Sequence, residues 1–430
     1  MTVALDDRDR ELLGGRAGDG AALAMRLVVR AADALGAERL IRITRAHVDS
    51  CLYHGQASLD FVRRLVDGRA RVSVPTTLNV GAVDLLHPEL WRGDEATAAR
   101  GRGLMEAYRE LGCRPTFTCA PYQLSDARPA LGEQVAWAES NAIAFCNSVL
   151  GARTERYGDF IDVACAITGR APDAGLHRTD GRRAVLVMRL APDVPATLRD
   201  ADVLYPVLGI VLGRRAGSRV AALDGLPPNQ AEDRLKAICA AAASSGAVAM
   251  FHVVGSTPEA PTLHAALQGG QPEEEIEVGL AELRAARDGL TSVEGAGGAP
   301  TARIGAVSLG TPHASLQELR AIAEELGDER VAPGIELLVS TGRDVLAAAE
   351  EADIAARLRR AGAELLVDTC SYLGPILRPS DLPTMTDSAK WAYYAPGNIG
   401  AEVVFGSRRE CLRSAVAGRI WRDEALWGGG

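Results

Sequence analysis

The sequence lacks any uninterrupted apolar run long enough to span a bilayer, and its acidic N-terminus, MTVALDDRDRELLGGRAGDG, lacks the apolar segment of a secretion signal. It also lacks an excess of positive charge, since 47 Lys and Arg residues oppose 56 Asp and Glu residues. The net charge of −9 argues against a nucleic-acid or anionic-membrane partner held by bulk electrostatics. We therefore expect a cytoplasmic protein that binds a small molecule, with no nucleic acid and no membrane as partner.

Several common catalytic and binding motifs are also missing. No Gly-Lys-Ser/Thr phosphate loop occurs, and the glycine-rich stretch at 14–20 does not follow a predicted strand, so nucleotide binding is disfavoured. Without a CxxC pair or an HExxH helix, a structural zinc knot or a zinc protease has no local support. The eight cysteines are spread along the chain, and in a reducing compartment they are core residues, metal ligands or nucleophiles more often than disulfides.

What the sequence does contain is an alternation of β-rich apolar runs with helical stretches. Its 430 residues exceed the size of one hydrophobic core, so two or three domains are expected. Amphipathic helices are predicted at 21–37, 315–326 and 343–362. Buried strands are predicted at 39–48, 71–80, 183–190, 246–255, 301–310, 333–341 and 363–371. This alternation predicts an α/β fold with mainly parallel sheets.

Polar residues and one cysteine fall at the ends of these predicted strands. Open α/β sheets bind ligands beyond the carboxyl ends of their strands, so these positions are candidates for a site. Each residue alone could be a satisfied polar group, and the recurrence at one kind of position is what singles out the set. Its members are His47, Asp49, Thr76, Thr77, Asn79, His252, Ser308, His313, Asp368 and Cys370.

Two stretches have the composition of linkers. GLTSVEGAGGAPTAR at 289–303 is rich in small residues, and a weaker break runs through 169–183. We therefore predict three domains, at 1–175, 176–295 and 296–430.

Many separate strings along the chain, in order from about residue 20 to residue 421, resemble the large subunit, or large-subunit region, of the aconitase X family. The resemblance implies an aconitase-like fold of three α/β domains around a central cleft, and a hydro-lyase with an iron–sulfur centre. Members dehydrate cis-3-hydroxy-L-proline or phosphomevalonate. The strings include HVDSCLYHG, VPTTLNVGAVDLLHPE, TCAPY, GEQVAWAESNAIAFCNSVLGARTERYGDF, FHVVGSTPEAPT, VSLGTPHASLQEL, VDTCSYLGPI and MTDSAKWAYYAPG.

The resemblance implies that Cys119, Cys146 and Cys370 are the thiolates that hold the cofactor. Three thiolates on a four-iron cluster leave one iron free to act as a Lewis acid, whereas an electron-transfer cluster takes four ligands. A four-iron cluster, a two-iron cluster and a single iron all remain open. The other cysteines are interpreted as core residues, except Cys51, which is a candidate for a place near the site.

Dehydration of a hydroxy acid requires a base, a carboxylate clamp and an electrophile at the leaving oxygen. Arg153 is the expected clamp, because a guanidinium binds a carboxylate through two donors. Lys390 is a second candidate cation. The catalytic candidates are Arg153, His47, Asp49 and Lys390, and the candidates for substrate binding are Thr76, Thr77, Asn79, Arg153, Ser308 and His313.

No base is assigned from the sequence. In the superfamily the base is often a serine on a swivelling fourth domain, which we expect on a separate small aconitase X subunit. The sequence departs from the family pattern at Ser50, Glu155 and Asp387, and Glu155 could compete for Arg153. Because all three thiolates remain, these departures favour an altered substrate over a dead site. A repurposed, non-catalytic subunit is the alternative.

Overall fold

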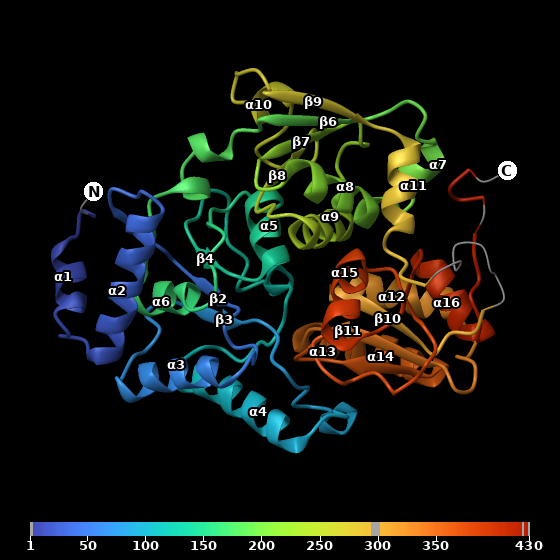
Figure 1. The fold of residues 1–430 in the computed structure, drawn as a ribbon, viewed down its shortest axis with the longest axis horizontal. Helices are drawn as coiled ribbons and strands as arrows, with labels where there is room; N and C mark the ends of the chain where they lie inside the picture. Colours follow the sequence, from blue (N-terminus) through green and yellow to red (C-terminus); the bar gives the residue numbers. More distant parts are fainter. Residues whose placement is uncertain (1–2, 294–301, 424, 429–430) are drawn as a thin grey trace.

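The computed structural model describes residues 3–293, 302–423 and 425–428. The predicted α/β class with mainly parallel sheets is confirmed, since three of the four sheets contain only parallel strand pairs. Figure 1 shows the N-terminal part on the left, the middle part at the top and the C-terminal part on the right. No helix in the described ranges is long and apolar enough to cross a membrane.

The first part contains a small parallel sheet of order β3-β2-β4 and an antiparallel pair of β1 and β5. The predicted strand at 39–48 is divided between these two sheets, because Ile43 and Thr44 bond to different partners, Gly169 and Gln134. The elements are α1 (Asp7–Leu13), α2 (Asp19–Ala34), β1 (Leu40–Arg42), β2 (Ala46–Val48), α3 (Gln56–Asp67), β3 (Thr76–Leu78), α4 (Glu95–Glu110), β4 (Ala136–Trp137), α5 (Ser140–Ser148), α6 (Ile161–Thr168) and β5 (Arg170–Pro172).

The second part is a parallel sheet of order β8-β7-β6-β9 covered by helices. Two strands of this sheet, β7 and β9, were not predicted from the sequence. The run EEIEV of β9 is mostly charged and lies exposed at the sheet edge, so it lacks the apolar pattern of a buried strand. The elements are β6 (Leu186–Leu190), α7 (Ala196–Arg199), α8 (Leu204–Ala216), β7 (Ala221–Asp224), α9 (Glu232–Ser245), β8 (Phe251–Val253), α10 (Leu263–Ala266), β9 (Glu274–Val278) and α11 (Leu280–Asp288).

The third part is a five-stranded parallel sheet of order β12-β11-β10-β13-β14. Successive strands first run outward from β10 to one edge and then from β13 to the other. The carboxyl ends of β10 and β13 therefore flank a topological switch point, the usual ligand position in open α/β sheets. The elements are β10 (Ala306–Ala314), α12 (Leu316–Leu326), β11 (Glu336–Thr341), α13 (Arg343–Glu351), α14 (Ile354–Ala361), β12 (Ala363–Leu366), β13 (Thr384–Thr386), α15 (Ala389–Ile399), β14 (Val403–Phe405) and α16 (Arg408–Ala417).

Two sequence predictions in this part need comment. The predicted helix at 343–362 is divided into α13 and α14 by Asp353, whose φ of 57° is left-handed, a conformation that Asp tolerates better than most residues. Of the predicted linker at 289–303, residues 294–301 lie outside the described ranges.

One buried core joins the three parts of the chain. The largest hydrophobic cluster includes Phe145 from the first part, Leu208 from the second and Phe405 from the third. A shared core fixes the relative positions of the sheets, so the ends of strands from different parts can form one site.

Asp368 ties the third part to the first and is itself held by an ion pair within the third part. The Arg343 guanidinium donates to both carboxylate oxygens of Asp368, at 2.5 and 2.6 Å, and the Asp368 side chain is fully buried. Asp368 also accepts from the Leu85 N–H at 3.0 Å, and its carbonyl accepts from the Gly81 N–H at 2.7 Å. Because Cys370 lies two residues further on, this contact also fixes the segment that carries it.

We expect Arg343→Met to destabilise the protein by about 3 kcal/mol, because it leaves the Asp368 carboxylate buried without its charge partner. The midpoint of urea denaturation measures this loss. Arg360→Met is the matched control, since its ion pair with Asp353 is exposed on both sides and should contribute little. Equal midpoints for the two variants would contradict the interpretation.

Candidate functional site

Cys119, His313 and Cys370 form a buried group in which the potential ligand atoms lie within 4.8 Å of one another. Cys119 precedes the short 3-10 helix Pro121–Gln123, His313 is the penultimate residue of β10, and Cys370 follows β12 by four residues. The three residues come from distant parts of the sequence, and each is at most 2% exposed. They become neighbours only when the chain folds.

His313 is already held in place by protein partners. Its Nδ1 lies 3.0 Å from the Thr118 hydroxyl, its Nε2 lies 3.1 Å from the Thr369 carbonyl, and its backbone N–H donates to the Cys119 sulfur at 3.2 Å. A metal bound by the ring would displace one of these contacts. The two sulfurs are therefore the better donors, and the donor set suits iron, which is commonly held by thiolates.

The two thiols differ in acidity. Burial acts to raise the pKa of Cys119, but the Cys370 sulfur, the Lys390 ammonium and the His313 N–H lower it to below its usual value. The contact with Cys119, together with burial, raises the pKa of Cys370. Because the thiolate is the metal-binding form, Cys119 is the sulfur better prepared to bind.

A buried ion pair between Glu139 and Lys390 lies beside these sulfurs. Glu139 is the N-cap of α5, where its side chain accepts from the Ala142 N–H, and Lys390 belongs to α15 of the third part. Burial acts to lower the pKa of Lys390, but the Glu139 carboxylate, Tyr372 and Cys119 together raise it well above its usual value, so the ammonium stays charged.

Glu139 also reaches the loop that carries Cys119. Its second oxygen accepts from the Asn141 amide, and the same amide donates to the Cys119 carbonyl at 2.9 Å. Tyr122 donates to the Asn141 oxygen at 2.7 Å and completes this network. Glu139 and Asn141 were not predicted from the sequence, because glutamate is not one of the residues that commonly mark an N-cap.

His47, Asp49, Thr77 and Asn79 lie together at one sheet edge, as their positions at strand ends predict. His47 and Thr77 face each other in the β2–β3 pair, with the His47 Nδ1 2.8 Å from the Thr77 hydroxyl, and the Asn79 amide donates to Asp49. The His47 Nε2 has no hydrogen-bond partner among the described residues, and burial lowers the pKa of this imidazole to about 3.

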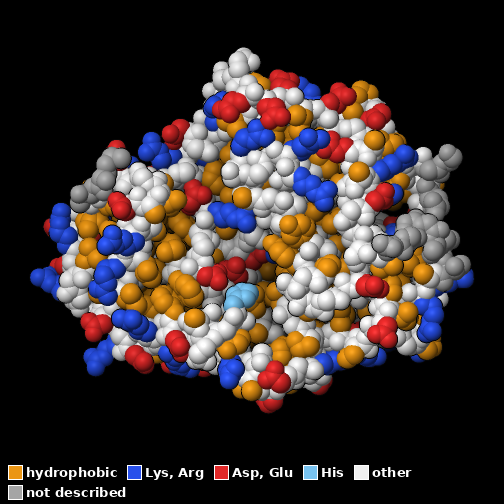
Figure 2. All heavy atoms as spheres, in the orientation of Figure 1, with side chains coloured by type: hydrophobic (Ala, Val, Ile, Leu, Met, Phe, Trp, Pro, Cys, Tyr) orange, Lys and Arg blue, Asp and Glu red, His pale blue; other side chains and the backbone are white. Residues whose placement is uncertain are grey.

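Asp49 is a carboxyl group whose pKa lies well above its usual range. Burial, followed by the charges of Glu139 and Asp159, raises its pKa to about 8. Figure 2 shows acidic side chains gathered near the middle of the face, next to a histidine, where the three parts in Figure 1 approach one another. Because Glu139, Asp159 and Asp162 all act on Asp49, its surroundings are acidic and favour a positively charged ligand group.

The remaining predicted residues occupy other places. Ser308 bonds to Ser371 at 2.8 Å, and Ser371 accepts from the Trp391 indole at 2.9 Å, so this buried network lies directly behind Cys370. The Thr76 hydroxyl donates to the Val74 carbonyl.

Cys146 and Arg153 are not brought into the Cys/His group. Cys146 is buried in α5, and burial raises the pKa of its thiol. Arg153 donates to the His177 carbonyl at 3.0 Å and the Thr179 hydroxyl at 3.1 Å. Glu155 accepts from the Leu176 N–H at 2.9 Å and forms no ion pair with Arg153 among the described residues.

Known proteins are similar to this chain over nearly its whole length. Models of the first, second and third domains of aconitase X match residues 2–180, 186–288 and 304–417. A cis-3-hydroxy-L-proline dehydratase from Pseudomonas aeruginosa is 44% identical over 98% of this chain and 72% of its own length. A protein of the same name from Hypocrea jecorina is 40% identical over 97% of this chain and 69% of its own length.

More distant relatives carry a different name. The phosphomevalonate dehydratase large subunit of Methanothermobacter thermautotrophicus is 34% identical over 96% of this chain and 98% of its own length. The crystal structure of holo-form aconitase X from Thermococcus kodakaraensis matches with a TM-score of 0.83 and 30% identity, over 96% of this chain and 100% of that one.

We expect Glu139→Gln to destabilise the protein by about 3–5 kcal/mol, because it leaves the Lys390 ammonium buried without a counter-charge. The double variant Glu139→Gln/Lys390→Met should regain most of this stability, since neither charge then remains buried. Denaturation midpoints check both expectations.

Glu232→Gln is the control for this pair, because the Glu232 side chain is half exposed where it bonds Arg128. A single variant at Glu139 as stable as this control would contradict a strongly coupled pair. So would a double variant no more stable than the single one.

Proposed function

The chain belongs to the aconitase X family, and we propose that it is the large subunit, or large-subunit region, of a hydro-lyase that dehydrates a small hydroxy acid. The proposed substrate is cis-3-hydroxy-L-proline. The relatives that carry this name are 40–44% identical to the chain, whereas the phosphomevalonate dehydratase large subunits are 29–34% identical.

The observation that carries this choice of substrate is the acidic environment of Asp49. Glu139, Asp159 and Asp162 all act to raise its pKa. Lys390 pairs with Glu139, whereas Asp159 and Asp162 form no ion pair with any described residue, so negative charge remains near these strand ends. Hydroxyproline has an ammonium group that such a site attracts, whereas a phosphorylated hydroxy acid has only anionic groups, which it repels.

We propose that an iron–sulfur cluster or a single iron is held by Cys119 and Cys370. His313 and Cys146 are the alternative third ligands. The burial of the Cys/His group and its donor atoms support His313. The bound iron would supply a Lewis acid for the leaving hydroxyl. Around it, Lys390 and Glu139 keep the Cys119 loop in place, and the neutral imidazole of His47 offers an unprotonated nitrogen.

Asp49 is the proposed proton-transfer group. With a pKa of about 8 it exchanges protons near neutral pH, which general acid–base catalysis requires. Asn79 orients it through the amide hydrogen bond to its carboxylate.

A second polypeptide is part of the proposal. Five archaeal relatives are named large subunits, and this chain aligns to 94–99% of the length of each of them. We therefore propose a small subunit as partner, which would close over the site and exclude water during the reaction.

The proposed ligands predict the iron content of variants purified anaerobically. We expect Cys119→Ser and Cys370→Ser to lose iron and its visible absorbance, because serine does not supply a thiolate. Cys165→Ser and Cys239→Ser are matched controls, since both thiols are fully buried in the core.

The iron content of Cys146→Ser and His313→Ala distinguishes the two candidates for the third ligand, because only loss of the true ligand should remove iron. Full iron in Cys119→Ser or Cys370→Ser would contradict the proposed centre.

Turnover of the iron-loaded protein, alone and together with a small subunit of the family, tests the proposed function. Cis-3-hydroxy-L-proline should be consumed and phosphomevalonate should not, as followed by mass spectrometry.

If Arg153 clamps the substrate carboxylate, Arg153→Lys should lower turnover about ten- to a hundredfold, because an ammonium cannot reproduce the two-donor contact.

The contacts of Arg153 with His177 and Thr179 give the competing outcome, a structural role in which Arg153→Lys lowers stability and leaves turnover unchanged. Arg178→Lys is the control, because Arg178 pairs only with the exposed Asp180. Consumption of phosphomevalonate in preference to hydroxyproline would overturn the proposed substrate.

A further inference from the structure

A pocket of about 320 Å³ opens between the second and third parts of the chain. Its floor is formed by Thr311 and Pro312 near the end of β10 and by Asp387 and Ser388 after β13. These are the two strands at which the order of the third sheet reverses. The pocket therefore occupies the switch point, where the fold leaves room for a ligand between strand ends and the beginnings of helices.

The pocket is lined by charges of both signs, nearly all of which already have partners. Arg234 pairs with Asp202 at 2.8 Å, and Lys236 pairs with Asp233 at 3.2 Å and with Glu318. The remaining lining cations are also paired, Arg408 with Glu325 at 2.7 Å and Lys390 with Glu139. A ligand thus finds no unpaired cation among the described lining residues.

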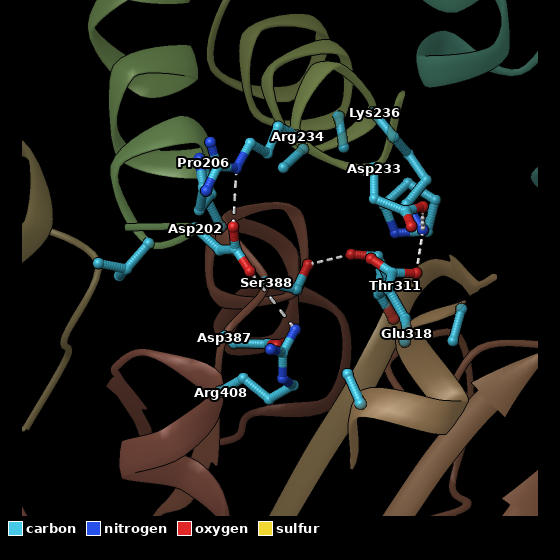
Figure 3. A pocket seen from close by; sticks show the side chains of 18 of the residues that line it. Asp202, Pro206, Asp233, Arg234, Lys236, Thr311, Glu318, Asp387, Ser388 and Arg408 are labelled. Atoms are coloured by element: carbon cyan, nitrogen blue, oxygen red, sulfur yellow. Dashed lines mark hydrogen bonds and ion pairs between the residues drawn. The ribbon is translucent and has the colours of Figure 1, made fainter. Parts of the chain in front are cut away.

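Asp387 is the exception. Its carboxylate forms no hydrogen bond or ion pair with any other described residue, and Figure 3 shows no contact drawn to it. Arg408 acts on it only as a nearby charge, and burial raises the pKa of Asp387 to about 7. A partly buried carboxylate without a donor is costly, so a donor supplied from the pocket would stabilise it.

A second polar atom in the wall also lacks a partner. The Thr311 hydroxyl is buried without a hydrogen bond among the described residues, and Thr311 is 8% exposed. The walls between the polar groups are formed by small apolar side chains, including Ala237, Ala240 and Ala321. The pocket therefore combines an unpaired carboxylate and an unpaired hydroxyl with room for a carbon skeleton.

We propose that this pocket binds a small organic ammonium compound, with the ammonium group on Asp387 and the carbon skeleton against the alanine walls. The proposal does not depend on the proposed function, because the pocket is separate from the Cys/His group. The two are nevertheless in contact through the chain, since His313 and the pocket residue Pro312 are neighbours. Lys390 also lines the pocket while its ammonium pairs with Glu139.

Ligand-detected NMR titrations with three five-membered-ring compounds test this proposal without any turnover. Pyrrolidine carries only the ammonium, L-proline carries the ammonium and a carboxylate, and cyclopentanecarboxylate carries only the carboxylate. Pyrrolidine and L-proline should bind saturably, and cyclopentanecarboxylate should not. Absence of saturable binding by pyrrolidine, or equal binding of all three compounds, would overturn the proposal.

Variants assign the binding to this pocket. Asp387→Asn should weaken pyrrolidine binding at least about tenfold, because it removes the charge from the hydrogen bond. Ala321→Leu should weaken it by filling the pocket. Asp381→Asn and Ala347→Leu are the matched controls, since both residues are exposed and lie outside the pocket.

Unchanged affinity in Asp387→Asn and Ala321→Leu would place the ammonium site elsewhere and overturn the proposal. A protein that binds pyrrolidine through Asp387 but dehydrates no hydroxy acid would uphold the pocket and refute the proposed function.

Discussion

The buried ion pair between Glu139 and Lys390 is the contact on which the arrangement of the candidate site depends. It joins the beginning of α5 in the first part to the beginning of α15 in the third part. Burying two charges costs free energy that only close pairing and further hydrogen bonds offset. Here Glu139 also caps α5 and accepts from the Asn141 amide, which in turn donates to the Cys119 carbonyl. The pair therefore links the beginning of α5, the contact between the first and third parts, and the loop that carries Cys119.

The parallel sheets explain why the functional groups meet where they do. Parallel strands end at a common edge, so His47 with Thr77, and Asp49 with Asn79, become neighbours through the register of β2 and β3. The third sheet contributes His313 and Cys370 in the same way, from β10 and β12. The shared core and the hydrogen bonds of Asp368 with Leu85 and Gly81 then bring these edges of two sheets together.

Much of this could be predicted from sequence, because buried strands have strong local signals. All seven predicted strand runs contain strands. His313 and Cys370 lie at or after strand ends as predicted, whereas His252 lies inside β8 and Ser308 near the beginning of β10. The short strands β13 and β14 were missed because three residues carry too little pattern. Glu139 was missed for a different reason: its importance comes from Lys390, 251 positions away, and no local pattern reports such a contact. The same limit applies to Cys146 and Arg153, whose resemblance to family motifs did not indicate which side chains they would contact.

The third sheet places two kinds of site on one strand. Near its end, β10 directs His313 toward Cys119 and Thr369, while Thr311 and Pro312 line the pocket at the switch point. The pairing register of β10 with β11 shifts between Leu309 and Ala314, so side chains there do not alternate regularly and neighbouring residues can serve different sites. A ligand that shifted Pro312 would act on the backbone N–H through which His313 holds the Cys119 sulfur. The strand end is thus one physical connection between the pocket and the thiolates, and Lys390, which lines the pocket and pairs with Glu139, is a second.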